Sequence, residues 1–403
     1  MDAITTALRG MYEEFPYPPA AAPEQRTGWN VELLLAYGKN KPASTRRIVL
    51  DAGCGRGAGL IGAAALQPNV TFVGADINRV ALAEAREQAK ARRLTNVSFH
   101  EVDLVTLEGL DIPSGGFDAI FSSGVVHHMP DPVIGLGKLA SVLAPHGMLQ
   151  LMVYGRRGRE PLYRLVRAMD RLLPREFPLR DRLMVARELT KSLTSDAVSC
   201  GPWADIKSIG DVELVDRYLN VNERSYDIPD LFELLDRSHL RFVRWTEPAE
   251  WDLASIVKSG PVMELAARLS DRERFMLVDE LAWRPRFELV VCGEANERRP
   301  SMSATELMQA TLAVSPEVSF VTEVRNVGGG QRVESVAIRV RSNPPVSFEN
   351  GLLASALLFL KDATEPFRGS ELVFLLGKNG IPLAPAQELL AHLVSSEILY
   401  ALP

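Results

Sequence analysis

The sequence predicts an α/β fold in which one mainly parallel sheet of seven strands is followed by a small α+β domain. Short apolar runs alternate with amphipathic helical stretches from residue 47 onward. A glycine-rich loop follows the first run, where Rossmann-like folds bind their ligands. The polar stretch 294–302 separates this region from a last segment with its own hairpin and helices. Such alternation of strands and helices gives right-handed crossovers and a sheet covered on both faces.

The expected strands of the Rossmann-like sheet are short apolar runs bounded by turn residues. They are 47–51, 70–76, 97–103, 117–122, 148–154, 240–245 and 287–293. Helices are expected between them, and helical inserts at about 156–227 and 249–284 interrupt the second half. We therefore expect one sheet domain over residues 46–293.

The two ends of the chain carry separate expectations. Residues 1–45 are predicted to form an N-terminal flap and a short helix near 28–38. Residues 304–403 are predicted to form a winged-helix-like interaction domain, with a hairpin around Gly328-Gly-Gly330. Its last helix, at about 384–396, has no lysine or arginine, so we expect no DNA binding. Partner binding, such as homodimerisation, is its expected role.

Composition excludes several classes of protein. The chain has 403 residues, 46% of them hydrophobic, and a net charge of −6, unlike a general nucleic-acid binder. It has neither a signal-peptide pattern nor an 18-residue apolar run, so we expect no membrane span. Cys54, Cys200 and Cys292 lie too far apart for a metal motif. We expect no metal and a cytoplasmic protein.

The glycine-rich loop, residues 49–57, leaves two cofactor classes open. Gly53, Gly55 and Ala58 fit the loose G-x-G-x-x-G/A pattern of dinucleotide-binding proteins, and Asp76 stands at a plausible ribose position. An NAD-type oxidoreductase is therefore one interpretation. Asp51 argues against it, because a carboxylate just before the loop would repel a pyrophosphate and would favour the ammonium group of a methionine moiety.

Four segments in order, DAGCGRG, GADIN, EVDL and FDAIFSSGVVHHMPDP, resemble the successive motifs of class I S-adenosylmethionine-dependent methyltransferases. The resemblance implies S-adenosylmethionine as cofactor and assigns positions to it. The glycines would wrap the cofactor, Asp51 would lie near its amino acid end, and Asp76 would bind the ribose. Asp103 would read the adenine edge. The full implied set is Asp51, Gly53, Cys54, Gly55, Gly57, Asp76, Ile77, Asp103, Leu104, Ser123 and Gly124.

Methyl transfer from a sulfonium is an in-line displacement, so alignment of the acceptor and exclusion of water matter most. An acceptor that must lose a proton also needs a base. His127 and His128 stand just beyond the fourth strand, at the edge where open sheets bind ligands. We predict either that one of them is the base or that the pair lines the pocket without titrating.

The leader Tyr12–Pro19 combines aromatic residues and prolines. It resembles the Tyr-Pro-Tyr-Pro leader of a bacterial methyltransferase subgroup, as does the stretch 222–231. We predict that Tyr12 and Tyr17 cover the methyl end of the cofactor; the alternative is a strap packed on the sheet edge. The overall plan also resembles, more weakly, bacterial protein lysine methyltransferases with extra carboxyl-terminal domains.

The acceptor is the open question. Residues 156–191 hold ten arginines and one lysine against five acids, which predicts a solvated helical face or a surface for an acidic acceptor. The large inserts and the extra domain favour transfer to an N or O nucleophile on a protein side chain over a small metabolite. A non-catalytic protein that only binds the cofactor is the remaining interpretation.

Overall fold

The computed structural model describes residues 2–19, 29–42, 46–194, 204–316, 318–327, 330–341 and 345–403. Cys200 and the first two glycines of the predicted hairpin turn lie outside these ranges. The chain divides into two compact units. Unit 1 contains Met1–Thr27 and Pro42–Glu297, and unit 2 contains Gly28–Lys41 and Arg298–Pro403.

Unit 1 is built on a seven-stranded sheet with the order β3-β2-β1-β4-β5-β7-β6, which confirms the predicted fold class. β1 to β5 are mutually parallel, and β7 runs antiparallel to both of its neighbours. The strand order reverses beside β1, which is where open α/β sheets bind ligands. The strands are β1 (Arg47–Ala52), β2 (Val70–Asp76), β3 (Val97–Glu101), β4 (Phe117–Ser123), β5 (Leu143–Tyr154), β6 (Leu240–Trp245) and β7 (Arg286–Gly293).

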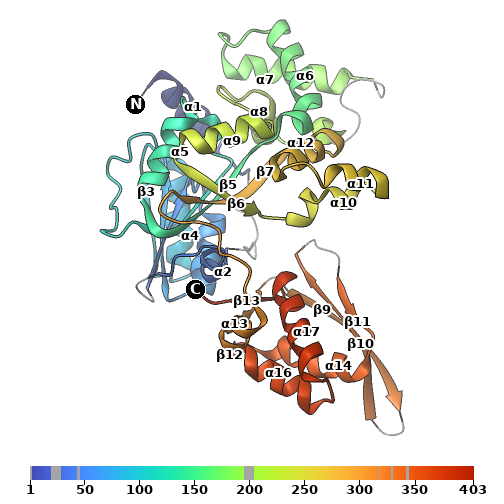
Figure 1. Cartoon of the computed structure of the whole chain (residues 1–403). Helices are drawn as coiled ribbons and strands as arrows, with labels where there is room; N and C mark the ends of the chain where they lie inside the picture. Colours follow the sequence, from blue (N-terminus) through green and yellow to red (C-terminus); the bar gives the residue numbers. More distant parts are fainter. Residues whose placement is uncertain are drawn as a thin grey trace. The chain divides into compact units, whose positions relative to one another are not determined.

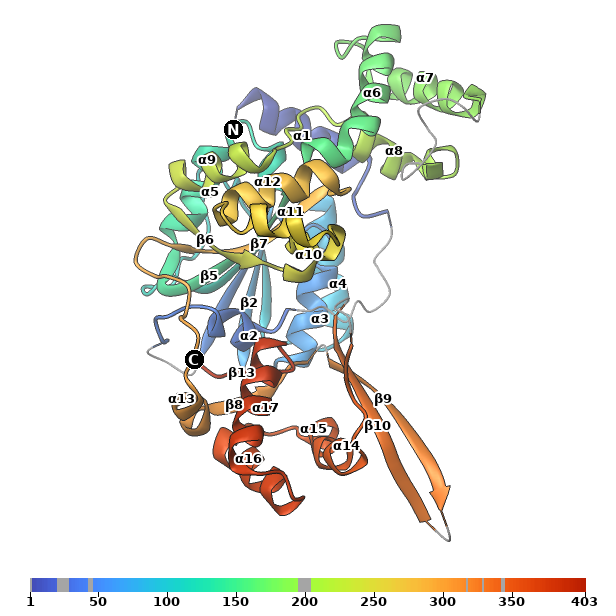
Figure 2. The same cartoon turned by 45° about the vertical axis from the view of Figure 1, so that its right-hand side comes forward.

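Helices cover both faces of this sheet (Figures 1 and 2). α3 (Ala58–Leu66) and α4 (Arg79–Ala91) lie on one face, and α5 (Pro132–Ser141) and α9 (Ile228–Arg237) lie on the other. Side-chain caps fix where α4 and α5 begin, because the side chain of Asn78 accepts the Ala81 N–H and that of Asp131 accepts the Val133 N–H. These starts hold the preceding loops at the carboxyl edge of the sheet.

Two helical inserts attach to the carboxyl edge of the central strands. The first follows β5 and contains α6 (Arg156–Leu172), α7 (Leu179–Ser192) and α8 (Asp211–Tyr218); the second, between β6 and β7, contains α10 (Leu253–Ile256), α11 (Gly260–Ala266) and α12 (Asp271–Leu281). The arginine-rich stretch is two helices, separated by a segment that contains Pro174 and Pro178. The sequence did not predict α8, since its eight residues make barely two turns of periodicity.

The N-terminal segment is a packed helix rather than a flap, so this part of the prediction was wrong. α1 (Ala3–Glu14) begins at Asp2, whose carboxylate accepts the Ile4 and Thr5 N–H groups. Leu8 and Met11 are 5% and 3% exposed and belong to the apolar cluster of α6, α7 and α8. Residues three positions apart share one helix face, and burial of that face holds α1 on the insert.

Unit 2 includes the short helix α2 (Val31–Ala36), which the sequence had grouped with the flap. Val31 and Leu35 are fully buried, and α2 packs against β13 (Leu399–Ala401). The Arg299 N–H donates to the Tyr37 carbonyl at 2.8 Å, which joins the two segments of unit 2. A helix that is apolar on most sides needs cover, and here the carboxyl-terminal segment provides it.

The rest of unit 2 is α+β, with two three-stranded sheets of order β11-β10-β9 and β12-β8-β13. The predicted hairpin is β9 (Val318–Val327) and β10 (Gly330–Val340). α13, α16 and α17 pack on one another. The sequence did not predict β8, β11, β12 or β13, which have only two to four residues. The remaining elements are α13 (Ala304–Gln309), β8 (Thr311–Val314), β11 (Val346–Phe348), α14 (Gly351–Leu357), α15 (Phe359–Asp362), β12 (Phe367–Arg368), α16 (Gly369–Lys378) and α17 (Leu383–Ser395).

The division into units predicts how the chain can be shortened. A protein that ends at Glu297 and in which a flexible linker replaces residues 28–41 should fold and bind the cofactor, because the seven-stranded sheet remains whole. The matched protein that ends at Glu297 but keeps α2 should aggregate, because its buried leucines lose their cover. Thermal unfolding and gel filtration measure both. If the linker protein is insoluble, the two units do not fold separately.

Candidate cofactor and acceptor site

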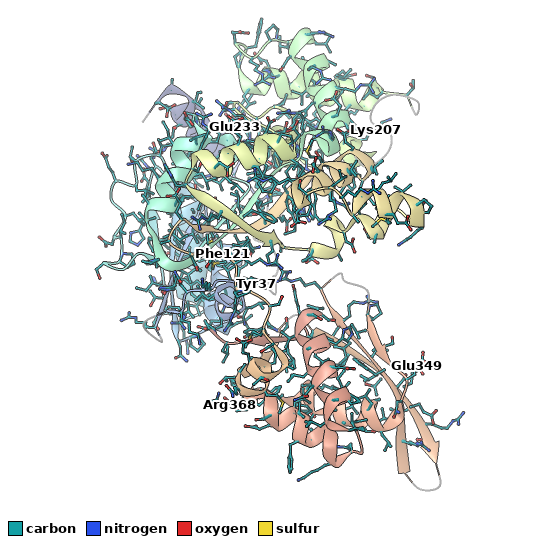
Figure 3. The ribbon with its side chains drawn as sticks, in the orientation of Figure 1. Tyr37, Phe121, Lys207, Glu233, Glu349 and Arg368 are labelled. Carbon is teal, nitrogen blue, oxygen red and sulfur yellow. The ribbon has the colours of Figure 1, made fainter. Side chains whose placement is uncertain are left out.

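The glycine-rich loop leaves β1 at the carboxyl edge of the sheet. Asp51, near the end of β1, is 6% exposed and pairs in register with Phe121 of β4, which is labelled in Figure 3. The Gly53 and Cys54 N–H groups both donate to the Ala75 carbonyl, at 2.8 and 3.1 Å. Gly53 and Gly55 have φ angles of 89° and 50°, in the left-handed region that glycine tolerates best.

Packing explains two of the three predicted cofactor glycines. A Cβ atom at Gly53 would lie 2.1 Å from Val125 Cγ2, and one at Gly57 would lie 2.8 Å from Phe99 Cε1. At Gly55 the nearest atom would be the Tyr17 carbonyl oxygen at 3.4 Å. The protein itself therefore requires glycine at positions 53 and 57, whereas Gly55 faces the leader segment.

Gly53→Ala should destabilise unit 1 by about 1–3 kcal/mol, because it adds backbone strain to a steric clash. Gly55→Ala is the matched control and should cost less, since only ordinary contacts surround that position. The double variant Gly53→Ala/Val125→Ala should recover part of the loss. Denaturant unfolding measures all three. If the loss of unfolding free energy in the double variant equals the sum of the losses in the two single variants, Val125 is not the source of the clash.

Asp76 ends β2 and fixes the loop. One carboxylate oxygen accepts the Gly55 N–H at 2.7 Å and the other accepts the Asn78 N–H at 2.8 Å. Burial raises the pKa of Asp76, and burial together with the charge of Asp76 raises the pKa of Asp51. A cationic ligand beside Asp51 would relieve this repulsion, and a pyrophosphate would increase it. This pair of carboxylates fits S-adenosylmethionine better than NAD.

Asp103, the residue predicted to read the adenine edge, lies slightly beyond the strand end where it was expected. β3 ends at Glu101, so Asp103 lies in the following turn rather than at the strand end. Its side chain accepts the Val105 N–H at 3.0 Å, and its carbonyl accepts the Leu107 N–H at 2.8 Å. The short side chain of Asp103 favours a turn at this point. Leu104, 5% exposed, anchors the turn in the core.

The residues expected to line the methionine end of the cofactor follow β4. Ser123 is the last residue of β4 and is exposed, and Gly124 has a φ of 76° and donates its N–H to the Met152 carbonyl at 3.3 Å. Ile77 is partly buried and packs with the cluster that contains Tyr12. These positions surround the carboxyl ends of β1, β2 and β4. Their roles toward the cofactor remain predictions.

The leader contacts the cofactor loop directly. The Tyr12 carbonyl accepts from Asn78 Nδ2 at 2.9 Å, and the Pro18 carbonyl accepts from Arg56 Nη1 at 3.0 Å. Tyr17, whose carbonyl faces Gly55, is 38% exposed. That Tyr12 and Tyr17 cover the methyl end of the cofactor stays a prediction, and Tyr12 lies in helix α1.

The two histidines lie in the 3-10 helix η1 (Val126–His128), not at the start of α5. His127 is fully buried, its ring lies 3.9 Å from that of Tyr154 between centroids, and within the described ranges neither ring nitrogen has a hydrogen-bond partner. Burial, followed by the charges of His128 and Arg159, lowers the pKa of His127 well below its usual range. The ring is therefore neutral. His128 Nδ1 bonds to the Asn222 carbonyl at 2.8 Å.

The sequence did not single out a cluster of polar side chains above the ends of β4 and β5. Arg159 is 3% exposed, and its guanidinium lies 3.6 Å above the Tyr154 ring and 3.1 Å from Glu223 Oε1. The Tyr12 hydroxyl donates to Asp216 in α8 at 3.0 Å. Arg159 and Glu223 fall in segments noted for other reasons. No pattern in the sequence pointed to Asp216 as a site residue, because its helix α8 was not predicted.

Comparison with known proteins identifies the class. Residues 44–171 match the family model described as a methyltransferase domain. These residues form a class I S-adenosylmethionine-dependent methyltransferase domain. This confirms the predicted enzyme class and cofactor. The comparison does not test the predicted Tyr-Pro leader.

Three relatives show how far the likeness of sequence extends. An uncharacterized protein of Synechococcus sp. is 28% identical over 70% of this chain and 69% of its own length. An uncharacterized protein of Rickettsia prowazekii is 32% identical over 31% of the chain, and the chain spans only 22% of it. The trans-aconitate 2-methyltransferase of Methylobacterium radiotolerans is 30% identical over 36% of the chain and 51% of its own length.

The structure of PKMT2 from Rickettsia typhi has a similar fold beyond the methyltransferase domain. It covers 96% of this chain and 78% of PKMT2, with a TM-score of 0.66 and 17% identity. A second structure of PKMT2, in complex with AdoHcy, covers 96% of this chain with a TM-score of 0.65. At this identity the likeness concerns the fold alone. Among the described residues, no helix is both long and apolar enough to cross a bilayer.

Proposed function

We propose that the protein transfers the methyl group of S-adenosylmethionine to a side chain of another protein. The observation that carries this proposal is an exposed apolar surface on the insert between β6 and β7. Six of its large apolar side chains are 37–62% exposed, and we infer that together they form an interaction surface. They are Ile256, Val262, Leu265, Met276, Leu281 and Trp283.

The same insert holds a pocket of about 350 Å³, at the lower end of the range for ligand pockets. It can accept an apolar side chain of a docked protein, and Asp252 and Arg274 supply polar groups at its wall. The apolar lining comes from Trp251, Leu253, Met263, Ala266, Ala267 and Phe275. A metabolite bound at the carboxyl edge would need neither this pocket nor the exposed surface.

Both ends of the insert are fixed at the edge that carries the cofactor motifs. Arg286 at the start of β7 pairs in register with Tyr154 at the end of β5. Trp283 Nε1 donates to the Gly158 carbonyl at 2.9 Å, which ties the insert to α6. An acceptor protein on this surface would therefore be docked beside the loop that presents the methyl group.

A small-molecule acceptor is the second candidate. The relative named trans-aconitate 2-methyltransferase favours it, but that likeness spans 146 residues, 36% of this chain. PKMT2, which was solved with AdoHcy, is similar in fold over 96% of the chain, including both inserts and unit 2. That likeness concerns the fold alone, so the exposed apolar side chains of the insert are what favour the protein acceptor.

The test uses the full chain with S-adenosyl[methyl-³H]methionine and two acceptor pools from one cell extract, the dialysed protein fraction and the low-molecular-weight filtrate. The proposal expects acid-precipitable label in the protein fraction. Trp283→Ala/Leu281→Ser should reduce that labelling without weakening cofactor binding, whereas Leu66→Ser, an exposed residue on α3, should not. Label in the filtrate alone would favour the metabolite and overturn the proposal.

A further inference from the structure

One carboxylate at the carboxyl edge of the sheet is buried without a cationic partner. Asp216 is 5% exposed, and its only side-chain hydrogen bond among the described residues comes from the Tyr12 hydroxyl at 3.0 Å. The nearby acids are paired, Glu213 with Arg217 at 2.7 Å and Glu223 with Arg159 at 3.1 Å. Asp216 forms no ion pair in the parts of the chain that the structure describes. A buried charge without compensation is costly, so it marks a functional site.

Three tyrosines feel the charge of this carboxylate, and the hydroxyl of one of them, Tyr12, bonds to it. Burial, and after it the charge of Asp216, raises the pKa of Tyr12, Tyr17 and Tyr154 alike, so all three tyrosines lie within its field. Tyr154 also packs on His127, the buried ring whose two nitrogens have no partner within the described ranges. A carboxylate attracts a cation by charge, and the Tyr12 and Tyr17 rings can add a cation–π interaction, since the Tyr154 ring already carries the Arg159 guanidinium at 3.6 Å.

Asp216 also lies where the methyl group would be presented. The same Tyr12 that donates its hydroxyl to Asp216 accepts, through its carbonyl, from Asn78, two residues beyond Asp76. The charge of His128, which follows β4, acts on Asp216 as well. Tyr12 therefore links the carboxylate to the residues that follow β2, one of the strands whose loops are assigned to the cofactor.

We propose, resting on the proposed function, that Asp216 binds the acceptor as a side-chain ammonium group and takes one of its protons. The amine nitrogen then bonds to the methyl carbon, the carbon–sulfur bond breaks, and sulfur leaves with the bonding pair as a neutral thioether. The neutral amine thereby takes over the positive charge of the sulfonium and becomes a methylammonium group, and the proton on Asp216 passes to solvent.

The chemistry of the residue supports this role. Burial raises the pKa of Asp216, while the charge of His128 and the Tyr12 hydrogen bond oppose that rise. A carboxyl group with a raised pKa takes a proton more readily than an exposed one. A negative carboxylate attracts a cationic acceptor, whereas a neutral hydroxyl acceptor gains no such attraction. The carboxylate therefore selects a cationic acceptor over a neutral one.

The experiment uses the full chain, S-adenosyl[methyl-³H]methionine and two polymers, poly-L-lysine and poly-L-glutamate. The wild type should label poly-L-lysine, and acid hydrolysis should release methyllysine. Asp216→Asn should lower kcat/KM for poly-L-lysine by at least about 100-fold, with the Kd for S-adenosylmethionine within a few fold. Asp216→Glu should restore part of the activity. The matched control is Asp211→Asn, at the exposed start of the same helix.

The outcomes separate this inference from the proposed function. Three outcomes would overturn the role of Asp216. They are labelling of poly-L-glutamate, labelling of neither polymer, and labelling of poly-L-lysine by Asp216→Asn at the rate of the wild type. The proposed function would stand in each case if cellular proteins are still labelled. If only the metabolite filtrate is labelled, the proposed function fails first. A melting temperature of Asp216→Asn near that of the wild type shows that the variant is folded.

Discussion

Asp76→Ala should weaken binding of S-adenosylmethionine by about 1.5–3 kcal/mol, or roughly 10- to 150-fold, because a charge-assisted hydrogen bond contributes that much. Asp76 is half-buried at the end of β2 and holds the loop through the Gly55 and Asn78 N–H groups. The variant loses this anchor and, with it, the contact to the ribose that the sequence predicts for Asp76. Calorimetric titration measures the affinity.

Two controls accompany this variant. Asp76→Asn keeps the shape of the side chain and separates the loss of charge from the loss of the loop anchor. Glu87→Ala removes an exposed carboxylate of α4 and should leave the affinity unchanged. An unaltered Kd in Asp76→Ala would show that the cofactor lies elsewhere than over β2.

Removal of residues 1–20 should abolish most methyl transfer and also lower stability. Stability falls as well as turnover because Leu8 and Met11 are buried in the cluster of α6 to α8. Burying one such side chain contributes about 1.5–3 kcal/mol. We therefore expect a melting temperature lower by several degrees and transfer reduced by roughly tenfold or more.

Tyr12→Phe separates the two effects. It removes the hydroxyl that bonds Asp216 and accepts from Asn220 Nδ2, but it keeps the ring on the cofactor side. Methyl transfer should fall while the melting temperature stays close to that of the wild type. Leu8→Ala should lower the melting temperature, while methyl transfer by the folded protein stays close to that of the wild type. Full activity in Tyr12→Phe would limit the role of α1 to packing.

The sheet was predictable because its strands are short apolar runs bounded by turns, and β2 and β6 begin and end as expected. The cofactor loop was predictable because its residues are close in sequence. The acceptor site was not, since Tyr12, Tyr154 and Asp216 come from three distant segments that only the fold brings together. The sequence could not show that Gly53 and Gly57 are required by Val125 and Phe99, which lie 72 and 42 residues farther along the chain.

The placement of α2 was missed for the same reason. Its apolar residues showed that the helix is buried, but not that strand β13, at the other end of the chain, covers it. The boundary at Glu297 falls within the predicted polar linker. Patterns along the chain thus predicted elements and loops, while contacts between remote segments decided the unit to which each belongs.

Titration of the full-length protein with S-adenosylmethionine and with NADH tests the central claim most directly. The carboxylates of Asp51 and Asp76 favour a cationic ligand and repel a pyrophosphate. We expect a Kd on the order of 1 μM for S-adenosylmethionine, about 8 kcal/mol of binding free energy, and no heat with NADH. Binding of NADH together with no binding of S-adenosylmethionine would contradict the assignment of the domain.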